Sequence, residues 1–164
     1  MPNEYPRISH YLKNEMNTSF VIESLSRLQK HNPDMFHLFY GGEPFLRNDL
    51  AYIINYCNSM NINYTIITNN TDSLMIDEFL ERVEVSGLTA SVDPIIFEEN
   101  VRGDRARKSE SGFDGLLRYK EKVKDLVAEV TVDRNSMRHL EKLVNELSEE
   151  GISSDRTHRF LCLL

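Results

Sequence analysis

The chain has 164 residues, the length of one domain, and at that size a hydrophobic core needs neither disulfides nor a structural metal. Hydrophobic residues make up 40 % and charged residues 27 %, which is typical of a globular protein. Nineteen lysines and arginines stand against 26 acidic residues, giving a net charge of -7. This balance argues against a nucleic-acid partner and against attraction to an anionic membrane.

The sequence also indicates a compartment. No run approaches the roughly 20 apolar residues of a membrane span, and Met1–Tyr5 lacks the basic start of a secretory signal. The two cysteines, Cys57 and Cys162, are far apart and form no CxxC pair. We therefore predict a cytoplasmic protein in which both cysteines are buried core thiols.

Short runs rich in β-forming residues alternate along the chain with longer segments of helical period. In chain order, the patterns predict a helix around Val21–Leu28, a strand at Met35–Tyr40, a helix at Leu50–Cys57, a strand at Tyr64–Thr68, a helix at Ile76–Val83, a strand at Leu88–Val92, a helix with more widely spread apolar positions at Phe113–Leu126, a strand at Val127–Val132, a helix at Leu140–Leu147 and a strand at Arg159–Leu163.

This alternation predicts βα units on a parallel sheet, because parallel neighbours need a crossover connection. Asn48 and Asp72 stand where helix N-caps are expected, and Gly151 stands where a C-cap is expected. The sequence has no clear linker and no low-complexity stretch. The sequence therefore predicts one α/β domain over residues 18–164, preceded by a segment over residues 1–17.

Polar and glycine residues follow three of the predicted strands: Gly41–Pro44, Thr68–Thr71 and Ser91–Pro94. Ligands bind at the carboxyl ends of strands in parallel α/β sheets, so these three stretches predict a binding site. Each also has a purely structural explanation. Gly41–Gly42 is typical of a tight turn, Asn69–Asp72 of a loop with an N-cap, and the side chains of the third stretch can bond local backbone.

These stretches carry a family resemblance. Phe39–Leu46, FYGGEPFL, resembles the GGEP motif of the radical S-adenosylmethionine (radical SAM) superfamily. Ile67–Thr71 resembles its TNG strand end, with Asn70 where glycine is commoner. Thr89–Asp93 resembles its SVDG strand end, with proline in place of the glycine, and Val101–Gly103 resembles its RG arginine stretch. The match runs from about residue 10 to the end of the chain.

The resemblance implies a partial (β/α)6 TIM-like barrel of parallel strands with outer helices and S-adenosylmethionine across its open top. It implies that Asn69 and Ser91 contact the ribose or the methionine portion of that cofactor. The full set of cofactor-binding residues that it implies is Gly41, Gly42, Glu43, Pro44, Asn69, Ser91, Asp93 and Arg102.

Within this set, the resemblance assigns charge-bearing roles to the two ends of the methionine portion. The backbone of the glycine turn receives the amino group, Glu43 attracts the same ammonium, and Arg102 or Arg105 meets the carboxylate. The structural alternatives are a carboxylate at a helix start for Glu43 and a solvated surface arginine for Arg102.

Radical SAM chemistry also needs a [4Fe–4S] cluster on three cysteines spaced CxxxCxxC, because soft thiolates hold iron in such clusters. With Tyr11 aligned to the aromatic residue of that loop, Asn3, Arg7 and His10 occupy the three ligand positions. None of them is cysteine. We therefore expect no cluster from this chain alone, and no metal ligands or catalytic residues.

The barrel's first strand, which precedes the cysteine loop in the family, is missing from the pattern. An unpaired neighbouring strand leaves an open sheet edge, and proteins usually cover such edges. We expect the N-terminal segment, a partner protein or a second copy in a homodimer to cover it.

Three functional hypotheses follow. The first is a degenerate radical SAM-like domain, a pseudoenzyme that keeps an S-adenosylmethionine-like pocket or acts as a binding or regulatory module. The second is a fragment or shortened form of an active radical SAM enzyme that modifies peptides or proteins. The third is an unrelated α/β interaction domain.

Overall fold

The computed structural model describes residues 16–93, 104–131, 137–152 and 159–163. The chain forms two compact units, Met1–Met35 and Phe36–Leu164, and the predicted division after residue 17 falls inside the first of them. Among the described helices, none is both long and apolar enough to cross a bilayer.

The first unit contains helix α2 (Thr18–His31). The Asn17 side chain caps this helix by accepting a hydrogen bond of 2.8 Å from the Ser19 backbone N–H. Of its predicted apolar stripe, Val21 and Leu25 are buried, whereas Leu28 is 42 % exposed. The helix predicted in this region is confirmed.

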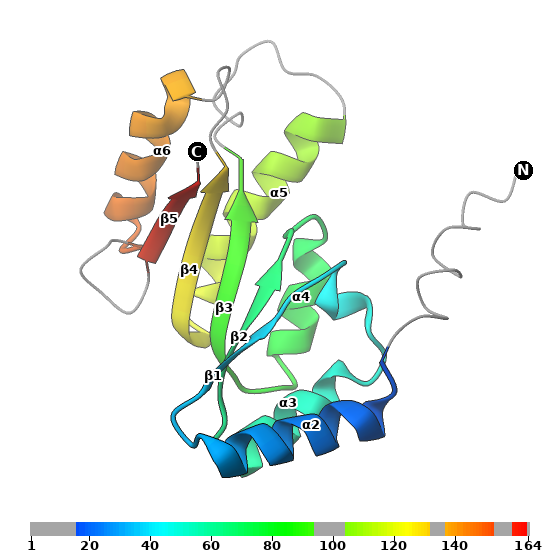
Figure 1. Ribbon diagram of the computed structural model, residues 1–164. Helices are drawn as coiled ribbons and strands as arrows, with labels where there is room; N and C mark the ends of the chain where they lie inside the picture. The colour runs from blue at the N-terminus through cyan, green and yellow to red at the C-terminus, as the bar shows by residue number, and fades with distance from the viewer. Residues whose placement is uncertain (1–15, 94–103, 132–136, 153–158, 164) are drawn as a thin grey trace, which may run out of the picture. The chain divides into compact units, whose positions relative to one another are not determined.

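The second unit is built on a five-stranded parallel sheet with the strand order β1-β2-β3-β4-β5 (Figure 1). Each strand pairs with the next strand in the sequence. The predicted parallel α/β architecture is thus confirmed. The strands are β1 (Phe36–Phe39), β2 (Asn63–Thr68), β3 (Val85–Val92), β4 (Val123–Thr131) and β5 (Arg159–Leu163).

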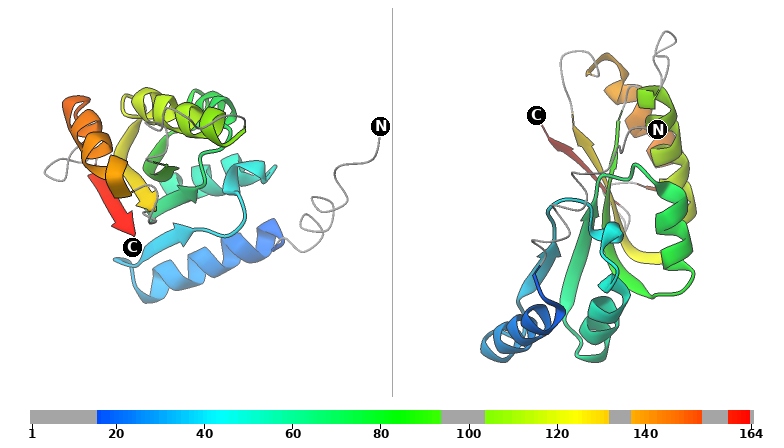
Figure 2. Two further views of the ribbon diagram at one scale, coloured as in Figure 1. Left: turned by 90° about the horizontal axis from the view of Figure 1, so that it is seen from above. Right: turned by 90° about the vertical axis from the view of Figure 1, so that its right-hand side faces the viewer.

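Helices connect these strands and cover one side of the sheet (Figure 2). Parallel crossovers are nearly always right-handed, so a sheet that grows in one direction carries its helices on one face. The connecting elements are the 3-10 helix η1 (Pro44–Leu46) and the α-helices α3 (Leu50–Ser59), α4 (Ser73–Leu80), α5 (Asp104–Tyr119) and α6 (Met137–Glu149).

The core lies between the sheet and these helices. Strand pairing aligns Leu88, Ala90 and Val92 of β3 with three apolar residues of β4, Leu126, Ala128 and Val130. All six are at most 4 % exposed, and successive residues of a strand point to opposite faces, so they form one continuous apolar layer. On the helices, the fully buried residues include Leu116, Tyr119, Leu143 and Leu147.

The structure corrects the helix predicted at Phe113–Leu126. Helix α5 ends at Tyr119, and β4 begins at Val123, four residues before the predicted strand start at Val127. The apolar positions of that segment were widely spread because it joins the end of a helix to the start of a strand. β3 likewise begins at Val85, three residues before its predicted start.

Two of the three predicted caps are confirmed. Asp72 caps α4 by accepting a 3.1 Å hydrogen bond from the Met75 N–H. Gly151 has φ +84°, and the backbone hydrogen bonds that it and Ile152 donate to the last turn of α6 form a Schellman motif. Asn48 is not a cap, because Asp49 occupies the N-cap position of α3 and its carboxylate pairs with Arg47.

Candidate functional site

The three predicted site stretches lie at the carboxyl ends of β1, β2 and β3. We call residues 41–43, 68–70 and 91–93 the rim. Because the three strands are parallel neighbours, their carboxyl ends meet at one edge of the sheet. Hydrogen bonds made by side chains join all three stretches.

The glycine turn after β1 is exposed and has a backbone conformation that favours glycine. Gly41 has φ +108° and Gly42 has φ +63°. A Cβ atom added at either position would meet no atom within 4 Å. The turn therefore presents its main chain to solvent without a side chain in front of it, so that a ligand can approach the backbone closely.

Glu43 ties this turn to the end of β2. Its carboxylate accepts hydrogen bonds from the Phe45 N–H at 3.3 Å, the Thr68 hydroxyl at 2.9 Å and the Asn69 N–H at 3.0 Å. Pro44 is buried at the first position of η1, where its missing N–H costs nothing. Three donors from within the chain occupy most of the acceptor capacity of the Glu43 carboxylate. Glu43 therefore holds the glycine turn against the end of β2.

Asn69 and Asn70 have opposite environments. Asn69 is exposed, and its Oδ1 accepts from the N–H of Thr71 at 3.0 Å and from the hydroxyl of the same residue at 2.8 Å. These two hydrogen bonds stabilise the loop, as expected if Asn69 has the purely structural role of a loop residue.

Asn70 is 1 % exposed and sits in the left-handed region with φ +55°. Its Nδ2 donates to the Ser91 carbonyl at 3.1 Å and to the Gly112 carbonyl at 2.8 Å. Its Oδ1 accepts from the Tyr119 hydroxyl at 3.1 Å. Sequence reasoning placed Asn69 in the site and gave Asn70 no role. The available signal was an asparagine directly after a strand, because asparagine tolerates positive φ.

Tyr119 extends the connection to helix α4. Its hydroxyl lies 3.1 Å from both Asn70 Oδ1 and the Ser73 carbonyl oxygen. Burial raises the pKa of Tyr119, so the phenol remains a neutral donor at physiological pH. Gly115 leaves room for this ring, because an added Cβ would lie 2.8 Å from the Tyr119 hydroxyl oxygen.

Ser91 and Asp93 are partly buried at the end of β3. The Ser91 hydroxyl lies 3.5 Å from a carboxylate oxygen of Glu129, its register partner on β4. Arg102 and the side chain of Arg105, the predicted partners of a ligand carboxylate, lie outside the described residues. The predicted cluster-ligand positions before residue 16 also lie outside them.

Cys57 is buried on the apolar face of α3, as predicted. Burial raises the pKa of its thiol to about 11. Cys162 lies in β5 as predicted, but its side chain lies outside the described residues. Among the residues that the structure describes, no group of three or more histidines, cysteines and acidic residues could hold a metal ion.

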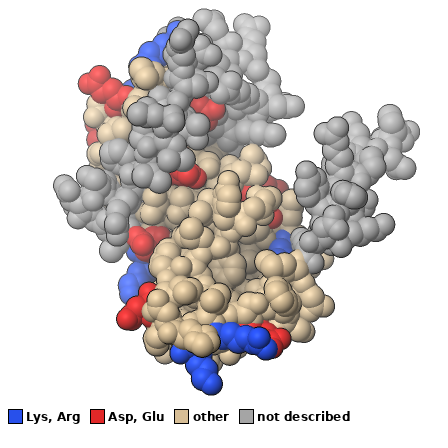
Figure 3. Space-filling view, in the orientation of Figure 1, with Lys and Arg blue, Asp and Glu red and all other residues tan. Residues whose placement is uncertain are grey.

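The opposite face of the sheet carries apolar residues at its β1 end. Phe36 and Leu38 are 56 % and 60 % exposed, and Tyr40, directly after the strand, is 78 % exposed. Figure 3 shows few charged side chains on the surface over β1 and β2. In the described sheet, β1 pairs with β2 alone, so its other backbone edge is open there.

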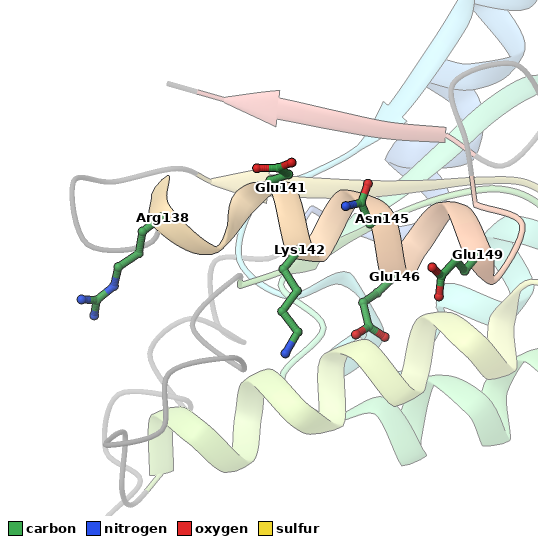
Figure 4. A pocket seen from close by; sticks show the side chains of 6 residues that line it. All are labelled: Arg138, Glu141, Lys142, Asn145, Glu146 and Glu149. Atoms are coloured by element: carbon green, nitrogen blue, oxygen red, sulfur yellow. The ribbon is translucent and has the colours of Figure 1, made fainter.

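A surface hollow of about 290 Å³ lies along α6, away from the rim. Figure 4 shows that its side chains are spread along one helix and do not converge on a common point. Its lining is Arg138, Glu141, Lys142, Asn145, Glu146 and Glu149, which includes none of the predicted site residues.

Comparisons with known proteins do not identify a family. No protein-family model matches the chain, and no curated protein matches it significantly in sequence.

Proposed function

We propose that this chain is a degenerate radical SAM-like domain, a partial (β/α)6 barrel that binds S-adenosylmethionine or a similar ligand at the rim and carries no cluster. The observation that supports it most strongly is the hydrogen-bond network that joins the three motif-like strand ends. Glu43 links the first to the second, and Asn70 links the second to the third.

The strand order supports the barrel part of this proposal. Each strand of the sheet lies beside the next one in the sequence, and the order never reverses. The wall of a βα barrel has this order, whereas a doubly wound sheet has a switch point at which the order reverses.

The glycine turn supports the ligand part. A methionine ammonium needs acceptors, and the exposed main chain at Gly41 and Gly42 can supply carbonyl oxygens without steric obstruction. Because Glu43 is occupied by donors from its own chain, we assign it to holding the turn, and we assign ligand contact to the glycine backbone.

The residues of this chain do not fit the iron–sulfur cluster of the family. Three thiolates are required, and the sequence holds only two cysteines, one of them Cys57 inside the core. We therefore derive no radical step, and the proposed activity is ligand binding, as in a binding or regulatory module.

Titration calorimetry of the purified chain with S-adenosylmethionine tests this function. We expect one equivalent to bind, and we expect Gly42→Val to abolish binding by forcing a branched residue into the turn. Gly151→Val is the matched control, because Gly151 also has positive φ but lies at the end of α6. Failure of the wild-type chain to bind, or equal binding by Gly42→Val, would contradict the proposal.

The second candidate is a shortened form of an active radical SAM enzyme. It is favoured by β1, which in the described sheet pairs with β2 alone and leaves an edge where the first strand of a barrel would pair. Anaerobic reconstitution with iron and sulfide separates the two. We expect no stoichiometric cluster, and a chain that holds four irons with a cluster absorbance spectrum would favour the second candidate.

The same edge supports our proposal that a partner protein or a second copy of the chain covers β1. Sedimentation at several concentrations is the direct test of a homodimer. A strictly monomeric chain would leave only a different protein, or the chain's own N-terminal segment, as the cover.

A further inference from the structure

We propose that Asn70 is the positioning residue of the rim: its side chain fixes the end of β3 and helix α5 against the end of β2, and so sets the geometry with which the rim meets its ligand. This inference rests on the proposed function. It concerns a residue whose side chain touches no ligand in that function and acts through its neighbours.

The side chain of Asn70 joins β3 to α5. Its Nδ2 donates hydrogen bonds to the Ser91 carbonyl on β3 and to the Gly112 carbonyl in α5. Its Oδ1 accepts a hydrogen bond from the Tyr119 hydroxyl. Ser91 and Gly112 are 21 residues apart in sequence, on either side of the β3–α5 connection. One amide group therefore links the end of β3 to the middle of α5.

A chain of hydrogen bonds also runs from Asn70 to the glycine turn. The Asn70 backbone N–H donates to the Thr68 Oγ1 at 3.0 Å, and the same hydroxyl donates to Glu43 at 2.9 Å. Glu43 in turn holds the backbone of Phe45, directly after the GGEP stretch. The left-handed turn at Asn70 is thus connected to the glycine turn through two side chains.

No other residue type meets both the backbone and the side-chain requirements of this position. Asparagine tolerates φ +55° and supplies two donors and an acceptor on one short side chain. Glycine would keep the backbone conformation and lose every side-chain bond. Aspartate would keep the size and the acceptor, but would place oxygen opposite the two carbonyls of Ser91 and Gly112.

The backbone of α5 at Gly112 also packs closely on Asn70 and on the end of β3. An added Cβ at Gly112 would lie 3.3 Å from Asn70 Nδ2 and 3.6 Å from the Ser91 carbonyl oxygen. We therefore expect the loss of the two Nδ2 hydrogen bonds to loosen the contact between the end of β3 and α5.

The test compares Asn70→Asp, Asn70→Gly and Tyr119→Phe with a control of similar stability loss, Leu147→Ala. Leu147 is fully buried on α6, outside the rim, and its truncation creates a core cavity. Each full-length variant is studied well below its unfolding temperature. The two readouts are the affinity for S-adenosylmethionine and the amide hydrogen exchange of peptides that cover residues 36–46, 68–76 and 88–93.

We expect Asn70→Asp and Asn70→Gly to weaken ligand binding by about tenfold or more, the change that follows when a bound group loses one well-placed hydrogen bond. We expect Tyr119→Phe to have a smaller effect, since it leaves both Nδ2 bonds in place. Leu147→Ala should bind as the wild type does. Exchange should rise in all three rim peptides of the Asn70 variants and in none of those of the control.

Two results would overturn the inference: exchange that rises only in the peptide containing Asn70, or a rise in the residue 36–46 peptide of Leu147→Ala equal to that of Asn70→Asp. The exchange experiment needs no ligand. A wild-type chain that fails to bind S-adenosylmethionine would therefore contradict the proposed function and still leave the role of Asn70 to be decided by exchange.

Discussion

Thr68→Val is the sharpest test of the rim as a structural unit. Thr68 is 1 % exposed, and its hydroxyl accepts from the Asn70 N–H and donates to Glu43. Valine has the same shape, so the change removes the hydroxyl without leaving a cavity. It leaves a buried N–H without its acceptor, which costs about 1–3 kcal/mol.

The loss of the donor to Glu43 adds to this cost. Glu43 is only partly buried, so water replaces some of the lost interaction, and we assign about 1 kcal/mol to it. The sum is about 2–4 kcal/mol, which in a domain of this size lowers the melting temperature by roughly 4–16 °C.

Urea unfolding followed by circular dichroism measures this change. Thr65→Val is a control from the same strand. Thr65 is 8 % exposed, and within the described part of the chain its hydroxyl makes one long contact, 3.5 Å from the Thr89 hydroxyl. We expect a loss below about 1 kcal/mol there. Thr68→Ser should recover most of the stability because it restores the hydroxyl. Equal losses for the two valine variants would refute the reasoning.

Three further predictions concern single buried residues. Burial raises the pKa of the Cys57 thiol to about 11. At pH 8 this thiol should therefore react with iodoacetamide far more slowly in the native chain than in urea, as peptide mass spectrometry can show. Equal rates would contradict its burial. Burial lowers the pKa of His37, so the native chain disfavours the proton that the unfolded chain accepts, and stability should fall as the pH drops below about 6.5. His37→Gln should flatten that part of the pH profile in urea titrations, and parallel profiles would exclude this cause. Gly115→Ala should lower the free energy of unfolding by about 1–3 kcal/mol in thermal unfolding, because the added Cβ would lie 2.8 Å from Ser73 Cβ. Asp114→Ala, on the exposed side of α5, should cause no such loss.

The sequence allowed the sheet to be predicted because its strands are short apolar runs with clear ends. The boundaries were less accurate where burial did not follow the apolar pattern. β3 includes Val85–Gly87, where Gly87 packs so closely on β2 that an added Cβ would lie 2.5 Å from the Tyr64 carbonyl oxygen. Glycine is a poor strand former, and only the tertiary contact explains its place.

The positions of glycine and polar residues allowed the three stretches to be placed at one edge of the sheet, but they did not indicate the contacts of the individual side chains. Glu43 was predicted to attract a ligand, and the structure shows that three donors of its own chain surround it. Local sequence gives no indication that Thr68 and Asn69, more than 20 residues away, supply two of them.

Asn70 illustrates the same limit. In the described chain, the two non-glycine residues with positive φ are both asparagines, Asn61 and Asn70. A left-handed position can be suspected from an asparagine after a strand or helix. The side-chain partners of Asn70 at Gly112 and Tyr119 could not be predicted from the sequence, because they depend on how α5 packs against the sheet.

The most direct test of the central claim is a backbone amide NMR titration of the metal-free chain with S-adenosylmethionine. We predict saturable shift changes concentrated at Gly41, Gly42 and the ends of β2 and β3. No shift change at ligand concentrations in the millimolar range, or changes centred on the α6 hollow at Glu141 and Lys142, would contradict the claim.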